Sequence, residues 1–166
     1  MVSANANISR VCSFYVSDWH FITMLLPHIN KKIDEGAKIT TILEEDAQER
    51  VETLLKKLKL ENTKKIIDID WRKKDIDYAN IKKVFNTKRQ DKEIIVSGTV
   101  EYINRVNNII EEYVSQNKIK DEIKIINCYY VTDNLNINEI LDYHKAVLNT
   151  AGEKSVKDFK RSISMM

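Results

Sequence analysis

The stretch Val11-Cys12-Ser13-Phe14-Tyr15-Val16, followed at once by Ser17-Asp18-Trp19-His20, decides the fold of this chain. The first six residues are a short apolar run of the kind that forms a buried strand. Ser17 is a suitable helix N-cap, and apolar residues recur at helical spacing from Trp19 until Gly36 ends the pattern. A strand that passes directly into a helix is the first half of a β-α-β unit.

Four further apolar runs repeat this pattern along the chain and predict four more strands. They are Lys38–Leu43, Lys65–Trp71, Glu93–Gly98 and Ile123–Val131. Helical patterns follow them, over Asp46–Leu60, Ile76–Phe85, Thr99–Gln116 and Ile137–Ala151. Strands joined by helices of this length are usually parallel, with right-handed crossovers. The sequence therefore predicts an α/β domain, a three-layer α/β/α sandwich with a mostly parallel five-stranded sheet.

Residues 1–152 make one predicted domain, because a length of 166 residues suits a single core. Residues 153–166 form a polar, basic tail, either a short final helix with one weak apolar face or a frayed end. Pro27 lies inside the first helical pattern, where it predicts a kink near Thr23 or a break into two shorter helices. His28, directly after it, is expected on the solvent side of that helix.

The composition excludes several classes of function. Lys and Arg total 27 against 25 Asp and Glu, and the two signs are intermixed, so direct nucleic-acid binding through bulk charge is not expected. The polar N-terminus lacks the features of a signal peptide, and no segment approaches 18 apolar residues, so we expect a cytoplasmic protein with no membrane span. Cys12 and Cys128 fall inside predicted strands without metal-binding spacing, which predicts buried, reduced thiols.

The motifs of nucleotide and metal chemistry are missing from the sequence. A phosphate cradle needs glycine after the first strand, and Val16-Ser17-Asp18-Trp19-His20 has none. Neither a GxxxxGK[ST] loop nor a GxGxxG fingerprint is present, so ATP hydrolysis by the P-loop route is not expected. The three histidines are isolated from one another. No cofactor and no metal site are predicted.

Parallel strands bring every strand-to-helix turn to one edge of the sheet, where α/β proteins bind ligands. This edge carries acids, hydroxyls, an imidazole and indoles, which suit a polar or partly aromatic small molecule. The residues are Ser17, Asp18, Trp19, His20, Glu44, Glu45, Asp70, Trp71, Ser97, Gly98, Thr99, Glu101, Thr132, Asp133 and Asn134. Ordinary helix capping is the alternative explanation, above all for Ser17, Thr99 and Asp133.

Two catalytic or metal constellations can be formulated from these residues. Ser97, His20 and Asp133 include the residue types of a hydrolase triad, but Ser97-Gly98 lacks the GxSxG elbow that exposes a nucleophile. Asp68 and Asp70 would share one face of the predicted third strand. That pair is either a magnesium-holding arrangement or the solvated face of an edge strand.

Several segments together resemble the MEDS domain, the sensory domain of methanogen and methylotroph regulators. They are Val11–Val16, the helix to Gly36 with the strand that follows it, Ser97-Gly98-Thr99-Val100-Glu101-Tyr102, Asn127-Cys128-Tyr129-Tyr130 and Ile140-Leu141-Asp142-Tyr143-His144. The resemblance implies a RecA/KaiC-like core without a Walker A loop, used for sensing or signalling. It points to Glu101, Tyr102, Cys128, Tyr129 and His144 as site positions, while Arg10 stands where the family commonly has a histidine.

The leading hypothesis is a non-enzymatic sensory or regulatory domain that binds a small molecule or a regulatory protein. The candidate ligand-binding residues are Tyr15, Ser17, Asp18, Trp19, His20, Ser97, Glu101, Tyr102, Tyr129 and His144. The alternative is a small enzyme, a hydrolase or phosphoryl-transfer protein, that uses Asp18, His20, Asp70 and Glu101. A scaffold that forms homodimers or larger oligomers is the third possibility.

Overall fold

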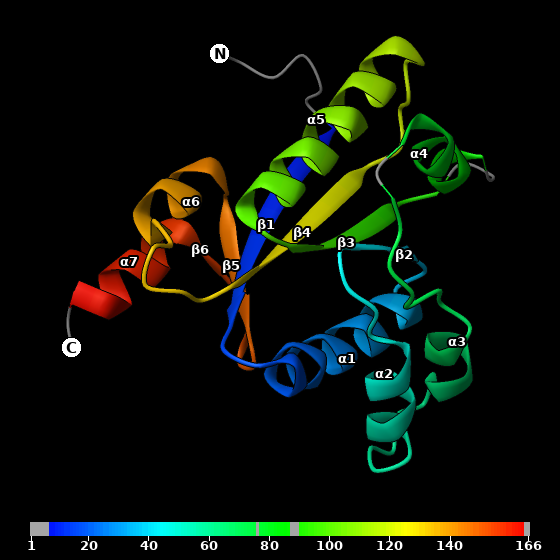
Figure 1. The fold of residues 1–166 in the computed structure, drawn as a ribbon, viewed down its shortest axis with the longest axis horizontal. Helices are drawn as coiled ribbons and strands as arrows, with labels where there is room; N and C mark the ends of the chain where they lie inside the picture. The colour runs from blue at the N-terminus through cyan, green and yellow to red at the C-terminus, as the bar shows by residue number, and fades with distance from the viewer. Residues whose placement is uncertain (1–6, 76, 87–89, 165–166) are drawn as a thin grey trace.

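The computed structural model describes residues 7–75, 77–86 and 90–164, and Figure 1 shows their fold. The strands are β1 (Ile8–Tyr15), β2 (Lys38–Leu43), β3 (Lys92–Gly98), β4 (Ile123–Tyr130), β5 (Ala146–Asn149) and β6 (Gly152–Ser155). The helices are α1 (Asp18–Asp34), α2 (Gln48–Leu55), α3 (Thr63–Ile67), α4 (Tyr78–Phe85), α5 (Val100–Gln116), α6 (Ile137–Tyr143) and α7 (Val156–Ser164). The sequence predictions that concern Met1–Ala6, Ile76 and Met165–Met166 fall on residues outside this description.

The strands form one sheet in the order β2-β3-β4-β1-β5-β6. All neighbouring strands are parallel except β6, which runs antiparallel to β5. The predicted α/β class and the mostly parallel sheet are confirmed. The described part of the chain has six strands, so the predicted number of five is corrected, and two of the six are not among those expected.

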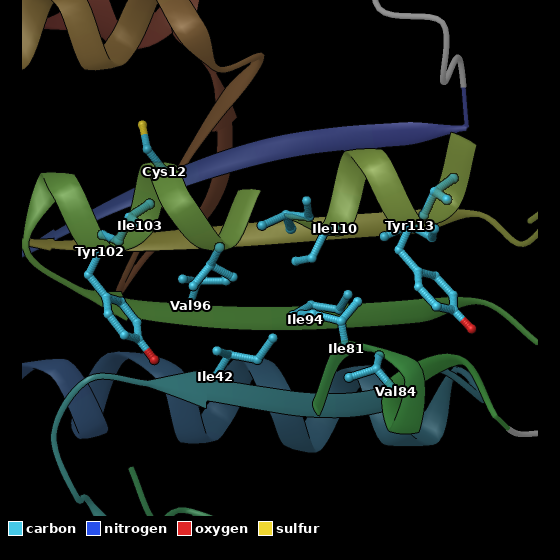
Figure 2. Close-up of a cluster of buried hydrophobic side chains, with 14 of the residues drawn as sticks. Cys12, Ile42, Ile81, Val84, Ile94, Val96, Tyr102, Ile103, Ile110 and Tyr113 are labelled. Carbon is cyan, nitrogen blue, oxygen red and sulfur yellow. The ribbon is translucent and has the colours of Figure 1, made fainter. Parts of the chain in front are cut away.

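Helices cover both faces of the sheet and enclose two apolar cores. One core joins α1, α2 and α3 to inward residues such as Val11, Ile95 and Ile126. The other joins α4, α5, α6 and α7 to the opposite face of the same strands. Figure 2 shows Ile94 and Val96 of β3 packed against Ile103 and Ile110 of α5. The strands therefore carry apolar side chains on both faces, as a sheet buried between two helical layers requires.

The predicted strand Lys65–Trp71 is wrong, because the chain there forms helix α3 and a loop. Asn62 fixes α3 against α1: its Nδ2 donates to the Asn30 carbonyl at 3.0 Å and to Asp34 Oδ1 at 2.9 Å. Trp71 is fully buried, and its Nε1 donates to the Ile66 carbonyl at 2.9 Å. The apolar residues of this segment thus pack under α1 and α2, and β2 stays at the edge of the sheet.

Because this segment is not a strand, Asp68 and Asp70 do not share the face of a strand. Asp70 instead pairs with Arg72, whose Nε donates to Asp70 Oδ1 at 3.0 Å. That hydrogen bond is the main reason why the pKa of Asp70 lies below its ordinary value. A carboxylate held by the guanidinium two residues away is a local loop contact. The magnesium arrangement and the edge-strand explanation are both replaced by it.

The predicted helix Ile137–Ala151 is also wrong in its second half. Helix α6 ends at Tyr143, and β5 follows beside β1, with Val11 opposite Ala146. His144 has extended backbone angles, and its side chain turns back to the carbonyl of Ile140 at 2.6 Å. Gly152 does not end a helix; it begins β6 with φ +111°, in the region that glycine tolerates best.

Helix α1 is continuous from Asp18 to Asp34, so the break predicted at Pro27 does not occur. His28 is not on the solvent side. Its Nε2 lies 2.9 Å from Glu93 Oε1, and the two side chains are 10% and 3% exposed. Within the described residues, no helix combines the length and the apolar character that crossing a bilayer requires.

Replacing Trp71 with phenylalanine tests the corrected α3 segment. Trp71→Phe removes the indole hydrogen bond to the Ile66 carbonyl, which then keeps only the Ile69 N–H at 3.2 Å, and it also shrinks a fully buried ring, so it should lower the free energy of unfolding by about 1–3 kcal/mol. Trp19→Phe is the matched control, because Trp19 is 48% exposed and its replacement should cost less than about 0.5 kcal/mol. Urea unfolding measures both, and equal effects would contradict the burial of Trp71.

Candidate functional site

A cavity of about 490 Å³ opens at the carboxyl edge of the sheet, over the ends of β1, β3 and β4. The chain leaves β1 toward the α1 layer but leaves β3 and β4 toward the opposite layer. Neighbouring strands whose connections depart to opposite faces create a crevice, the usual ligand site of an open α/β sheet. The lining residues are Tyr15, Asp18, Phe21, Glu44, Glu45, Asp46, Ala47, Arg50, Ser97, Gly98, Thr99, Val100, Tyr129, Tyr130, Thr132 and Leu135.

Aromatic rings around Tyr15 form one wall of the cavity. The ring of Tyr15 lies 4.9 Å from that of Phe21 and 5.5 Å from that of Tyr130, centroid to centroid. Its hydroxyl is 3.1 Å from Ser97 Oγ, and both residues are only 7% exposed. Burial raises the pKa of Tyr15 to about 12. Tyr15 therefore offers the cavity a neutral phenol, a hydrogen-bonding group and not a general base.

Carboxylates also belong to the cavity lining, and Glu44 is held there by a backbone hydrogen bond. Because Leu43 of β2 lies opposite Ser97 of β3, the residue after β2 meets the turn between β3 and α5. Glu44 Oε1 accepts a hydrogen bond from the Thr99 backbone N–H at 2.8 Å. A Cβ at position 98 would lie 2.7 Å from the same oxygen, so this approach requires Gly98.

Two further acids in the lining are engaged by their own neighbours. Asp18 pairs with Arg50 across 3.4 Å, and Arg50 also donates to the backbone carbonyl of Asp46 at 3.0 Å. The Asp46 carboxylate accepts the backbone N–H of Lys73 at 2.5 Å. With Glu44 and Glu45, the lining holds four carboxylates against one guanidinium, a formal charge of −3.

Four of the predicted ligand-binding residues line this cavity. They are Tyr15, Asp18, Ser97 and Tyr129. They come from β1, α1, β3 and β4, and the parallel register of the strands brings them together. The edge residues Glu44, Glu45, Gly98, Thr99 and Thr132 join them there.

Other predicted residues lie at the same edge but have local roles. Ser17 caps α1, since its Oγ accepts the His20 N–H at 3.1 Å, and Thr99 caps α5 in the same way through Tyr102. His20 Nδ1 accepts the Val16 N–H at 3.1 Å. These contacts match the capping alternative for Ser17 and Thr99, whereas the cap of α6 is Asn136 and not Asp133.

The remaining predicted residues do not line the cavity. Trp19 is half exposed, and Glu101 is exposed in the first turn of α5. Tyr102 is buried, and its hydroxyl donates to the Lys74 carbonyl at 3.0 Å. Of the four residues proposed for an enzyme, Asp18 alone belongs to the lining, because His20, Asp70 and Glu101 make the contacts described above or face solvent.

His144 belongs to a buried polar network on the α5 face of the sheet. Its Nε2 accepts from Asn127 Nδ2 at 2.9 Å, and Asn127 exchanges hydrogen bonds with Asn107. Arg10 Nε donates to Asn107 Oδ1 at 3.0 Å. Burial lowers the pKa of His144 to about 4, so the ring is neutral at physiological pH. Arg10 and His144, two of the positions named by the resemblance, thus take part in one structural network.

Cys12 and Cys128 are free and buried, as predicted. Burial raises the pKa of Cys12 to about 12, so its thiol is protonated and unreactive. Among the residues that the structure describes, no group of three or more histidines, cysteines or acids could hold a metal ion.

Sequence reasoning missed seven residues of the cavity. These are Phe21, Asp46, Ala47, Arg50, Val100, Tyr130 and Leu135. Only Arg50 carries a signal that could have found it, because it lies one helical turn after Asp46 at the start of the second helical pattern. The others are ordinary apolar, aromatic or helix-start positions whose placement depends on the strand order.

Comparison of the chain with family models, curated proteins and solved structures finds no match. The site therefore has to be interpreted from its own residues.

Replacing His144 with glutamine tests the buried network through pH. The native pKa of about 4 lies below the ordinary value of 6.5, so the unfolded state binds the proton more readily. Above pH 6.5 the neutral ring makes its full contribution to the free energy of unfolding. This contribution, up to about 3 kcal/mol, is lost as the pH falls toward 4. His144→Gln, which cannot titrate, should remove this part of the slope.

Urea unfolding at several pH values between 4 and 7 measures the difference between the two proteins. Parallel pH profiles for wild type and His144→Gln would show that the imidazole is not held neutral in the native state.

Proposed function

We propose that the protein is a non-enzymatic binding module of a sensory or regulatory kind, and that it takes a small molecule into the carboxyl-edge cavity. The observation that carries this proposal is the cavity itself, which lies where the connections of β1 and β4 depart to opposite faces of the sheet. Its volume of about 490 Å³ and its mixed aromatic and polar lining are those of a small-molecule site.

The residues at this edge disfavour a nucleotide. A phosphate bound at the N-terminus of α5 would need the Thr99 N–H, which Glu44 already occupies at 2.8 Å. The surrounding carboxylates would also repel a triphosphate, and Arg50 is engaged with Asp18. The sequence has no phosphate loop to compensate for this repulsion.

The lining favours binding over catalysis for a chemical reason. The hydroxyls of Tyr15 and Ser97 are hydrogen-bonded to each other, and burial keeps the phenol protonated. No imidazole belongs to the lining that could activate Ser97, because His20 is turned to the Val16 amide. General acid or base catalysis requires a group whose pKa lies near the working pH and which reaches the substrate.

The MEDS-like interpretation and the RecA/KaiC-like core form part of this proposal. A mostly parallel sheet between two helical layers is the architecture that such a core requires. For signalling, the exposed apolar side chains at the same edge provide a surface for a regulatory protein or a second copy of the chain. These are Val16, Trp19, Val100 and Tyr130, each 41% to 63% exposed.

Titration with Mg-ATP tests the exclusion of nucleotides. Isothermal calorimetry of the whole chain should detect no binding at millimolar Mg-ATP, and incubation should release no phosphate. Saturable, magnesium-dependent binding with product formation would contradict the proposal, because both Glu44 and the missing phosphate loop argue against it.

A fragment screen followed by NMR tests the location of the site. Fragments that bind should shift the backbone amides of Tyr15, Gly98 and Tyr129, since these residues line the cavity. Val100→Trp should weaken their binding by narrowing the cavity, whereas Val16→Trp, at an exposed position outside the lining, should not. Fragment shifts that cluster elsewhere, or no hits from a diverse set, would overturn the assignment.

A further inference from the structure

We propose that the cavity selects a small organic cation, an ammonium or guanidinium group carried on an aromatic or aliphatic body. This inference rests on the proposed function, because it assigns a ligand class to the same cavity.

The lining of the cavity carries a net negative charge. Asp18, Glu44, Glu45 and Asp46 face one basic residue, Arg50. Arg50 lies 3.4 Å from Asp18 and donates to the Asp46 carbonyl at 3.0 Å, while its buried Nε has no hydrogen-bond partner among the described residues. One guanidinium therefore stands against four carboxylates in the lining, and this excess of negative charge favours a positive ligand over an anionic one.

The N-termini of α1 and α5, which lie at the cavity, do not reverse the negative charge of its lining. N-termini of helices attract anions when their N–H groups are free. At α1 the Ser17 side chain takes the His20 N–H, and Asp18 adds a negative charge in the first turn. At α5 the Thr99 side chain takes the Tyr102 N–H, and Glu44 takes the Thr99 N–H. Both positive ends are thus offset by side chains of the protein itself.

The neutral part of the lining suits the rest of such a ligand. Rings of Tyr15, Phe21, Tyr129 and Tyr130 belong to the lining, and aromatic rings pack against an aromatic body and attract cations. The Tyr15 hydroxyl and Ser97 are more than nine-tenths buried and bond only to each other within the described chain, so hydrogen-bonding capacity remains for a ligand.

Glu45 is the carboxylate most available to the cationic group. It is exposed, it belongs to the lining, and it makes no ion pair or hydrogen bond in the part of the chain that the structure describes. The other three acids have partners of their own. Removing the charge of Glu45 should therefore lower the affinity for the cationic ligand without disturbing the fold.

Three probes of similar shape and different charge test the inference by NMR titration of the whole chain. They are phenethylammonium, its neutral isostere 2-phenylethanol, and the anion 3-phenylpropionate. Phenethylammonium should shift the amides of Tyr15, Gly98 and Tyr129 and should bind at least about tenfold more tightly than the neutral probe. The anion should bind more weakly still. Among the three probes, added salt should weaken the binding of the cation alone.

Glu45→Gln should reduce the affinity for phenethylammonium about fivefold and leave the affinity for 2-phenylethanol unchanged. Glu61→Gln is the matched control, because it removes the same charge from an exposed glutamate outside the cavity. Equal or tighter binding of the neutral or anionic probe at these amides would overturn the cation assignment but leave the binding module intact. Absence of any shift with phenethylammonium would also overturn the assignment, whereas the fragment screen decides the proposed function separately.

Discussion

The hydrogen bond from the Thr99 amide to Glu44 is the contact on which the character of the site depends. It joins the residue after β2 to the first turn of α5 at 2.8 Å and occupies the position where a phosphate would otherwise bind. Gly98 permits it, since any side chain there would collide with Glu44. Glu44 thus occupies the anion position at the start of α5 and adds to the negative charge of the cavity, within an architecture that commonly binds nucleotides.

The rest of the structure fixes this contact in place. Strands β2 and β3 lie side by side in parallel, so their ends coincide, and the apolar layer between β3 and α5 fixes the start of the helix (Figure 2). Buried polar groups hold the surrounding framework: the pair of His28 and Glu93 joins α1 to β3, and the network of His144 joins β4 to the α6 end. The ends of strands and helices therefore position one part of the cavity lining, and the loops after β2 and β4 supply the rest.

The sequence predicted the elements with strong periodicity and failed where an alternative packing partner decided the outcome. The pattern around Ile66, Ile69 and Trp71 fits a strand, but Asn62 fixes this segment against α1 and the indole bonds to a carbonyl five residues away. Val147 of β5 pairs with Cys12 of β1, which is far away in the sequence. No local sequence pattern therefore reveals β5. Within the site, residue types at strand ends identified Tyr15 and Ser97, whereas the convergence of Glu44 on Thr99 depends on strand order, which the sequence does not contain.

Amide hydrogen exchange at Thr99 tests the central interaction most directly. Thr99 is exposed and precedes the first turn of α5, so its N–H would exchange rapidly if Glu44 did not accept it. We expect measurable protection of this amide in the native protein and its loss in Glu44→Ala, with protection of the α5 interior retained. Rapid exchange at Thr99 in the unmodified protein would contradict the hydrogen bond between Thr99 and Glu44.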